Sequence, residues 1–400
     1  MDLTTVDLTD PDLYVPAVPH QLFAQLRRDH PVFWHEEQDG PGFWSVMRYH
    51  DLVAVNRNSA TFSSYTGGAL MMSWNEEVLA QQRLMMLNMD PPMHTRYRRL
   101  VNKGFTPRMV AELEQTVVDR TRQLVTEARL KGEFDLVADI AAELPLQVIA
   151  ELMGVPQEDR HKVFDWSNRM VGSNDPEFTE APELATEAAM ELFAYADALT
   201  AERHADPHDD LLSILVHAEI AGDRLSQLEV DLFFMLLSVA GNETTRNQIA
   251  HGTLALIENP DQRKLLIERP ELLDSAIEEM LRYASPVMHF RRTATKDTKI
   301  GGQRIAEGDK VIFWHASANR DEEVFQDPDR FDITRTPNEH VAFGGGGSHF
   351  CLGANLARLE MRIMFTELMQ AMPDLELAGE VQRLRSNFIN GIKHLPVAAG

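Results

Sequence analysis

The protein has 400 residues, of which 44% are hydrophobic and 25% are charged, a balance typical of a globular chain with a large core. Its 62 acidic and 38 basic side chains give a formal net charge of −24. Because such a charge repels phosphates, we expect no nucleic-acid partner. No apolar run approaches the roughly eighteen residues of a membrane span. The acidic N-terminus does not resemble a secretion signal, so we expect a cytoplasmic protein.

The first part of the chain predicts strands and then a long run of helices. Residues 32–34 and 43–46 alternate aromatic and polar side chains around Gly40-Pro41-Gly42, which predicts a β-hairpin. From about residue 93 to residue 285 the pattern is helical, with breaks at prolines and glycines. Residues 226–257 contain no proline and are apolar on more than one face, so they predict a long buried helix.

A second strand-rich piece follows these helices. Residues 299–305 predict a hairpin and residues 310–315 predict another strand. After a proline-containing loop and a glycine run, a last helix is expected at 354–372. No repeat or linker marks a boundary. The sequence therefore predicts a single domain over residues 1–400, mainly α with small β-sheets.

Cys351 is the only cysteine, so the chain cannot form an intramolecular disulfide. A single cysteine is most often a small buried apolar side chain. Here it follows four consecutive glycines at 344–347, which disfavour helix and strand and let the backbone approach a flat or bulky group. It also lies at the predicted start of the last helix, where free N–H groups would lower the pKa of the thiol. The pattern favours a functional thiolate.

Two other interpretations of this segment are weaker. A phosphate-binding glycine loop needs a GK[ST] or G-x-G-x-x-G pattern in a strand-to-helix turn, and neither is present here. A cysteine nucleophile needs a base, and His349 is close in sequence. The local signatures of cysteine hydrolases are absent, however.

The segment from Phe343 to Gly353 resembles the cysteine-ligand loop of the cytochrome P-450 family, whose pattern is Phe-x-x-Gly-x-x-x-Cys-x-Gly. Gly347, Cys351 and Gly353 match this pattern. Phe343 departs from it, because the loop is one residue longer, a variant associated with bacterial lipid and steroid hydroxylases. The resemblance implies a cytochrome P-450 fold, with haem b between the long central helix and this loop. It also implies that Cys351 is the iron ligand.

A second motif lies inside the predicted long helix, which contains Ala240-Gly241-Asn242-Glu243-Thr244-Thr245. Glycine, asparagine and threonine are poor residues for the middle of a helix, and one alternative is a helix end with a capping threonine. The apolar pattern resumes at Ile249, which favours a continuing helix. The run resembles the family's oxygen-binding groove. The resemblance implies that Gly241, next to Ala240, leaves space for dioxygen, that Thr244 hydrogen-bonds it, and that Glu243 relays protons.

Two further motifs follow the family's order. Glu279 and Arg282 resemble its Glu-x-x-Arg pair, with Arg330 as the expected third partner of a structural triad that holds the cysteine loop. In isolation such a helical pair would mean little, because it contributes only a few tenths of a kcal/mol. His94 and Arg98 share one helix face, and a solvated basic turn is the simple alternative.

Within the family pattern, basic side chains bind the haem propionates through charge-assisted hydrogen bonds. Arg292 is expected to contribute, and the adjacent Arg291 is the alternative at that position. The complete expected cofactor-binding set is His94, Arg98, Arg292, Phe343, His349, Cys351 and Gly353.

The resemblance implies a haem-thiolate monooxygenase that uses dioxygen and two electrons. No flavin or nicotinamide motif is present, so we expect electrons from a ferredoxin and its reductase. Their expected docking face contains Arg99, Lys103, Arg358 and Arg362, although a solvated helix surface would also explain these residues.

The substrate is expected to be a steroid side chain, a methyl-branched lipid or a terpenoid, held in an apolar pocket. By family analogy, the expected pocket residues are Val287, Met288, Phe290, Phe388 and Ile389. A monomer is expected. A haem-thiolate sensor or ligand carrier without turnover is the alternative, against which the Glu243-Thr244 pair argues.

Overall fold

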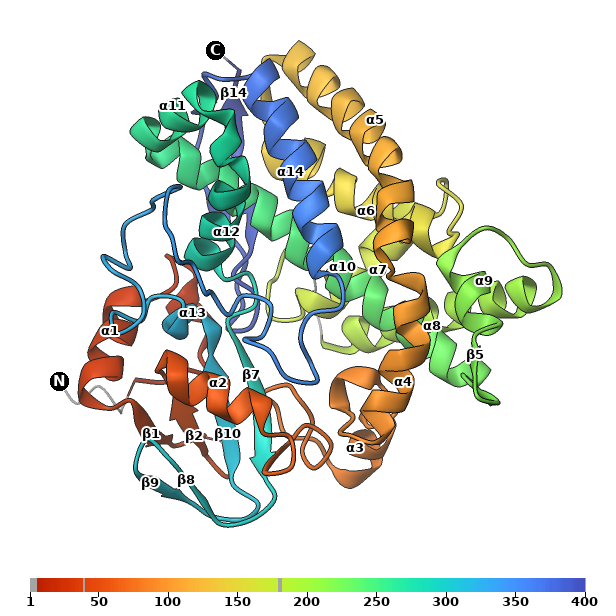
Figure 1. The fold of residues 1–400 in the computed structure, drawn as a ribbon, viewed down its shortest axis with the longest axis vertical. Helices are drawn as coiled ribbons and strands as arrows, with labels where there is room; N and C mark the ends of the chain where they lie inside the picture. Colours follow the sequence, from red (N-terminus) through yellow and green to blue (C-terminus); the bar gives the residue numbers. More distant parts are fainter. Residues whose placement is uncertain (1–5, 39, 179–181, 400) are drawn as a thin grey trace.

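A computed structural model of the chain describes residues 6–38, 40–178 and 182–399. The strands of the larger sheet lie at the lower left of the view in Figure 1, and the longer helices fill the upper and right-hand parts, where some short strands also lie. The helices are α1 (His20–Asp29), α2 (Tyr49–Arg57), α3 (Glu76–Gln82), α4 (Met93–Val101), α5 (Pro107–Lys131), α6 (Glu143–Met153), α7 (Arg160–Val171), α8 (Pro182–Ala205), α9 (Leu211–Val216), α10 (Gln227–Glu258), α11 (Pro260–Glu268), α12 (Leu273–Ala284), α13 (His315–Ala318) and α14 (Ala354–Ala371).

The strands form one larger sheet and several small ones. They are β1 (Val32–His35), β2 (Phe43–Val46), β3 (Phe62–Ser63), β4 (Glu133–Asp135), β5 (Glu219–Ile220), β6 (Asp223–Arg224), β7 (His289–Ala294), β8 (Thr298–Ile300), β9 (Gln303–Ile305), β10 (Lys310–Trp314), β11 (Glu376–Leu377), β12 (Gln382–Arg383), β13 (Ile392–His394) and β14 (Pro396–Ala398). The larger sheet has the order β1-β2-β10-β7-β3.

Pairing within these sheets confirms the predicted hairpins. β1 and β2 pair antiparallel, with Trp34 opposite Trp44. β8 and β9 form the hairpin predicted at 299–305. β10 lies parallel to β2 and antiparallel to β7, so β7 is an inner strand of the larger sheet. The strand predicted at 310–315 ends one residue earlier, because His315 begins α13.

The predicted long buried helix is α10. Ser226 caps it: the Ser226 hydroxyl accepts the N–H of Glu229, and the Glu229 carboxylate accepts the N–H of Ser226. The helix contacts α6, α7, α8, α12 and α14, and Figure 1 shows it crossing the helical part behind α14. It continues through residues 240–246 without a break, as its resumed apolar pattern predicts.

Some short strands were not predicted. β4, β5 and β6 interrupt the region expected to be helical, and β4 pairs with β14 near the other end of the chain. Strands of two or three residues are too short to show an alternating pattern, so sequence gives no signal for them. Among the described residues, no helix combines the length and apolar character that crossing a bilayer requires.

Candidate functional site

The loop before α14 is closed by its own backbone. The N–H of Cys351 donates to the carbonyl of Phe343 at 3.0 Å, so the cysteine and the phenylalanine meet although the loop is one residue longer than the family pattern. The guanidinium of Arg358 lies 4.6 Å from the centre of the Phe343 ring. The ring is thus fixed between the loop and α14. Gly353 is the residue before α14, and its N–H approaches the thiol of Cys351.

The thiol of Cys351 remains accessible, yet much protein surrounds it. Removal from bulk water raises its pKa, and this outweighs the opposing effects of the Gly353 N–H and the positive charges of Arg98 and Arg358. The N–H at the helix start does lower the pKa of the thiol, as expected, but desolvation is the larger effect, so the net shift in the protein alone is upward. A bound metal cation reverses this balance, since a coordinating thiol is deprotonated outright.

A cluster of basic side chains lies near this loop. The rings of His94 and His349 are 4.2 Å apart, and His349 Nε2 lies 3.0 Å from the carbonyl of Met89. Burial, with the nearby charges of Arg98 and Arg292, lowers the pKa of His94 to about 4. Both histidines are therefore neutral at pH 7, because the pKa of His349 is also well below its ordinary value for the same reasons.

The cationic members of this cluster form no close ion pair within the described parts of the chain, although the more distant charge of Asp90 acts on Arg292 and His94. No carboxylate forms an ion pair with Arg98 or Arg292, and Nε2 of the buried His94 has no hydrogen-bond partner there. Burial lowers the pKa of Arg292 to about 10, so its guanidinium is charged at neutral pH. A buried positive charge without a counter-charge is costly, and a bound anion would offset that cost.

Adjacent arginines of β7 point to different places. Arg292 is the one near His94 and His349, and its Nη2 donates to Oδ1 of Asn56 at 2.7 Å. Arg291 instead donates from Nη1 to the carbonyl of Met72 at 2.8 Å. Neighbouring strand residues face opposite sides, so only one of the two can join the cluster. The structure favours Arg292 for this position.

The middle of α10 presents one uncovered stripe. Accessible positions there are Leu236, Val239, Ala240, Gly241 and Thr244. Ala240 is exposed, whereas the other four are half-buried. Ala240 and Thr244 are four residues apart and share a face. The Thr244 hydroxyl donates to the carbonyl of Ala240 at 2.7 Å. The stripe thus offers a hydroxyl beside a small side chain.

Glu243 does not lie on this stripe. It is buried (1% exposed), and one carboxylate oxygen contacts Arg246, one turn further along α10. Arg246 in turn donates from Nη1 to Oδ1 of Asn168 in α7 at 2.8 Å. Burial raises the pKa of Glu243, although the charge of Arg246 opposes this. Glu243 is therefore linked, through its contact with Arg246, to Asn168 of α7.

Gly241 serves packing more clearly than it provides space. A Cβ atom at this position would lie 2.6 Å from Cδ1 of Ile149 in α6. The missing side chain lets α6 approach α10 closely. Ile149 fills the space on that side, so the expected room for dioxygen would have to lie on the accessible side of Gly241.

The predicted triad is present with one wrong member. Glu279 accepts hydrogen bonds from Arg282 Nε and Nη2, both at 2.8 Å, and both residues are fully buried. The third side chain is Arg335, with its Nε 3.0 Å from Glu279 Oε2.

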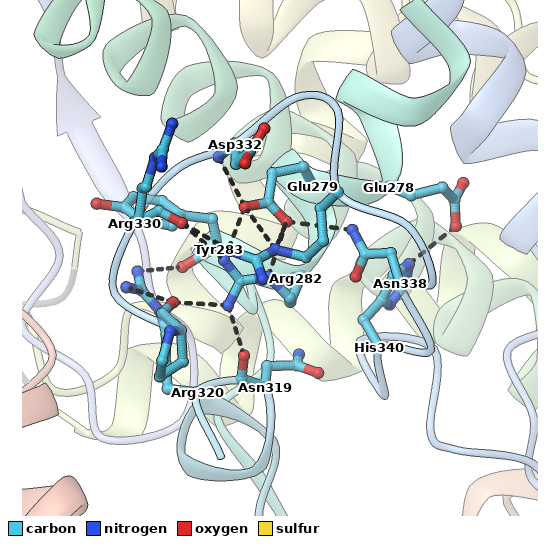
Figure 2. A network of polar contacts seen from close by, with 12 residues as sticks. Glu278, Glu279, Arg282, Tyr283, Asn319, Arg320, Arg330, Asp332, Asn338 and His340 are labelled. Atoms are coloured by element: carbon cyan, nitrogen blue, oxygen red, sulfur yellow. Dashed lines mark hydrogen bonds and ion pairs between the residues drawn. The ribbon is translucent and has the colours of Figure 1, made fainter. Parts of the chain in front are cut away.

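Arg330 was expected in this place, but it contributes only its backbone carbonyl, which accepts from Arg282 at 3.2 Å. Figure 2 shows its side chain pointing away from Glu279. The prediction of Arg330 is therefore wrong, because the irregular loop turns that side chain outward.

The expected pocket residues divide into two groups. Val287, Phe290 and Phe388 are only half-buried, and the rings of Phe290 and Phe388 are 5.6 Å apart. Met288 has no accessible surface and packs in a core cluster with Trp314, so its assignment to a pocket is wrong. Ile389 is 4% exposed and pairs through its backbone with Val287. The half-buried three remain the candidates to line a lipophilic pocket.

The residues present fit a haem. It needs one ligand to iron, partners for two carboxylates, and a face clear of bulky groups. The accessible Cys351, the arginines without a close ion-pair partner and the small Ala240 on α10 supply these features. Sequence reasoning missed Asn56 and Arg335, since neither belongs to a motif and both act across large sequence separations.

Comparison with known proteins gives consistent matches. Residues 17–373 match the family described as "Cytochrome P450". The chain is 44% identical to a steroid C26-monooxygenase of Rhodococcus jostii, over 98% of this chain and 84% of that protein. It is 43% identical to a linalool 8-monooxygenase of Pseudomonas putida, over 98% of both chains.

Two further matches agree with these. A methyl-branched lipid omega-hydroxylase of Mycobacterium tuberculosis is 44% identical, over 94% of this chain and 90% of that protein. Among solved structures, a Mycobacterium marinum protein in complex with pseudoionone superposes with a TM-score of 0.92 at 40% identity, over 98% of both chains.

Proposed function

Because the chain belongs to the cytochrome P450 family, we propose that it is a haem-thiolate monooxygenase that hydroxylates a lipophilic substrate with dioxygen and two electrons. Membership confirms the fold predicted from the sequence. The observation that carries the proposal is the basic cluster, whose arginines Arg98 and Arg292 form no ion pair with a described carboxylate, beside the accessible Cys351. The matched relatives are named as monooxygenases and hydroxylases, which disfavours a sensor without turnover.

The family's cofactor is a haem iron, and we assign it here as haem b. Cys351 would bind the iron, and the cluster of His94, Arg98, Arg292 and His349 would hold the propionates. Bound haem supplies the redox chemistry that activates dioxygen, and a thiolate ligand favours cleavage of the O–O bond. Phe343 and Gly353 shape the loop around the thiolate.

Thr244 and Glu243 are the residues that would handle protons. The Thr244 hydroxyl donates to the carbonyl of Ala240, so it is held on the stripe, and its oxygen can still accept a hydrogen bond. Glu243 is buried with a raised pKa and contacts Arg246, which reaches Asn168 in α7. Arg246 would fix the orientation of this carboxyl, because a guanidinium only donates and keeps its protons. Glu243 Oε1 has no hydrogen-bond partner among the described residues, so it is the atom that would take up and pass on a proton.

The proposed substrate is a largely apolar lipid. The relatives act on steroids, linalool and methyl-branched lipids, all of which are largely apolar. The half-buried Val287, Phe290 and Phe388 would hold such a molecule by shape, because they offer apolar surface and no charge.

Electrons would come from a ferredoxin and its reductase. Two of the four basic residues expected at the docking face are engaged in ion pairs within the protein. Arg358 binds Glu278 at 2.6 Å and Arg362 binds Asp274 at 2.8 Å. Both charges are largely neutralised by these ion pairs, so the exposed Arg99 is a stronger candidate contact than either.

The proposal is tested by replacing Thr244. The holoenzyme and its Thr244→Ala variant are assayed for NADH consumption, peroxide and hydroxylated product, with surrogate ferredoxin and reductase and a panel of steroids, terpenes and branched fatty acids. We expect the parent to form product, and Thr244→Ala to bind substrate while diverting electrons to peroxide.

Thr253→Ala is the matched control, because the Thr253 hydroxyl makes the same bond to a carbonyl one turn earlier, at 2.9 Å, but is buried away from the stripe. Full coupling in Thr244→Ala would remove Thr244 from the proton path. If the parent enzyme shows no CO difference spectrum of the thiolate-ligated type, the proposed function itself is contradicted.

A further inference from the structure

The last turn of α2 lies against the glycine run that precedes Cys351. The side-chain amide of Asn56 donates to the carbonyls of Gly344 and Gly346, the second at 3.0 Å. Arg57 donates from Nε to the carbonyl of Gly345 at 2.9 Å. Two adjacent residues of α2 therefore bind three consecutive carbonyls of a loop almost 290 residues further along the chain.

This loop needs partners from outside itself. All four glycines at 344–347 have positive φ angles, of 100°, 66°, 97° and 84°. Such a run forms no regular backbone ladder, so its carbonyls must be bound by other groups. The glycines also let α2 approach: a Cβ atom at Gly347 would lie 2.8 Å from the carbonyl oxygen of Asn56.

The other end of the Asn56 amide reaches the cationic cluster. Its Oδ1 accepts a hydrogen bond from Nη2 of Arg292 at 2.7 Å, and both side chains are buried, at 4% exposed each. An amide suits this position because it offers two N–H donors for the carbonyls and one acceptor for the guanidinium. Neither an apolar nor an anionic side chain provides both.

We propose that Asn56 is a positioning residue for the thiolate ligand. It holds the loop that carries Cys351 at a fixed distance from Arg292. The iron ligand and a propionate-binding cation therefore keep fixed positions relative to each other. This inference rests on the proposed function, because it requires that a haem is held between these groups. It adds a residue outside every motif found in the sequence, and one that would touch neither the iron nor the substrate.

The consequence is a specific loss when the amide is removed. Truncation would leave two half-buried carbonyls and the buried guanidinium of Arg292 without this partner. Mutating a group that orients a metal ligand typically lowers metal affinity by about 10- to 100-fold. The loop would then have freedom to move the sulfur. Weaker haem retention and a smaller fraction of thiolate-ligated iron are both expected.

The test compares the holoenzyme with its Asn56→Ala, Asn56→Asp and Asn58→Ala variants. Asn58 is the control, since it is an exposed asparagine at the same helix end. Two readouts are the CO difference spectrum, which distinguishes thiolate-ligated from thiol-ligated iron, and the rate of haem transfer to excess apomyoglobin. We expect Asn56→Ala to lose haem about tenfold faster and to show a mixed CO spectrum.

Asn56→Asp keeps an acceptor for Arg292 but loses the donors to the carbonyls, so it should also show the mixed spectrum. Asn58→Ala should match the parent in both readouts. If Asn56→Ala does not fold, Asn56→Asp decides the question by the same measurements. Parent-like spectra and haem-loss rates within twofold in these variants would overturn the inference. A parent without a thiolate signature would instead overturn the proposed function.

Discussion

The guanidinium of Arg335 binds the carboxylate of Glu279, with Nε 3.0 Å from Oε2, although the two residues are 56 positions apart. Glu279 has no exposed surface, and its two oxygens also accept from Arg282, Asn338 and the N–H of Asp332 (Figure 2). A buried carboxylate with this many donors is a fixed point for the loop that leads to the cysteine.

This relationship predicts different costs for two arginines of the same loop. Arg335→Ala leaves part of a buried charge uncompensated, so we expect the free energy of unfolding to fall by about 3 kcal/mol. Arg330→Ala removes an exposed side chain and keeps the carbonyl, so its effect should stay within about 0.5 kcal/mol. Chemical denaturation of the two variants beside the parent measures both. A loss of stability in Arg330→Ala as large as that expected for Arg335→Ala would show that the side chain of Arg330 belongs to the triad.

The contrast shows which parts of the site a sequence can predict. Glu279 and Arg282 are three residues apart on a helix, so helical geometry alone places them together. Arg335 lies in an irregular loop, whose side-chain directions follow no period. Nothing in the local sequence distinguishes it from Arg330, and only the folded path of the loop decides between them.

The strand after α12 shows a different limit. Val287 and Phe290 keep accessible surface while Met288 is fully buried. Val287 and Met288 precede β7, and positions 287 and 290 would not share a face of an alternating strand, so no sequence period predicts which of these apolar residues is accessible. The thiol of Cys351 shows a third limit, since the helix start was visible in the sequence but the desolvation that raises its pKa was not.

Glu243 is expected to matter for turnover and not for binding. In Glu243→Gln the buried side chain keeps its size but can no longer carry a proton, so we expect product formation to fall by about 100-fold or more. Substrate-induced spectral shifts should keep their half-saturation concentration. The control is Glu258→Gln, an exposed acid at the end of the same helix. A Glu243→Gln enzyme with parental turnover would exclude Glu243 from proton delivery.

Glu360 is a buried acid that the proposed chemistry does not use. It is 2% exposed, its Oε2 has no hydrogen-bond partner among the described residues, and burial raises its pKa to about 8. Because the folded pKa exceeds the unfolded value, the folded state binds the proton more tightly. The free energy of unfolding should therefore fall as pH rises from about 4.5 to about 8.

Glu360→Gln should remove this dependence. A neutral amide of the same size has no charge to bury, so we expect the variant to gain up to about 3 kcal/mol at neutral pH and little at pH 4.5. Denaturation curves across this pH range measure the difference. A variant whose stability parallels that of the parent at every pH would show that the carboxyl is not protonated in the fold.

His394 joins three segments near the end of the chain. Its Nδ1 lies 2.6 Å from Oδ2 of Asp135 in β4, and its Nε2 lies 2.8 Å from Oε1 of Glu177, which follows α7. Burial by itself would lower the pKa of His394, but the two carboxylates together raise it above the ordinary value. The charged imidazole therefore stabilises the contact between the strands and the segment after α7.

The sign of the pH effect follows from that raised pKa. The stabilisation is complete below the ordinary histidine pKa of about 6.5 and is lost as pH rises through the higher folded value. We expect His394→Gln to lower the Tm by about 1–2 °C at pH 6 and by less at pH 9, since the side chain is partly exposed and Lys393 also binds Glu177. His30→Gln, at an exposed histidine, should show no such trend. A loss that grows with pH would mean that the neutral ring makes the important contact.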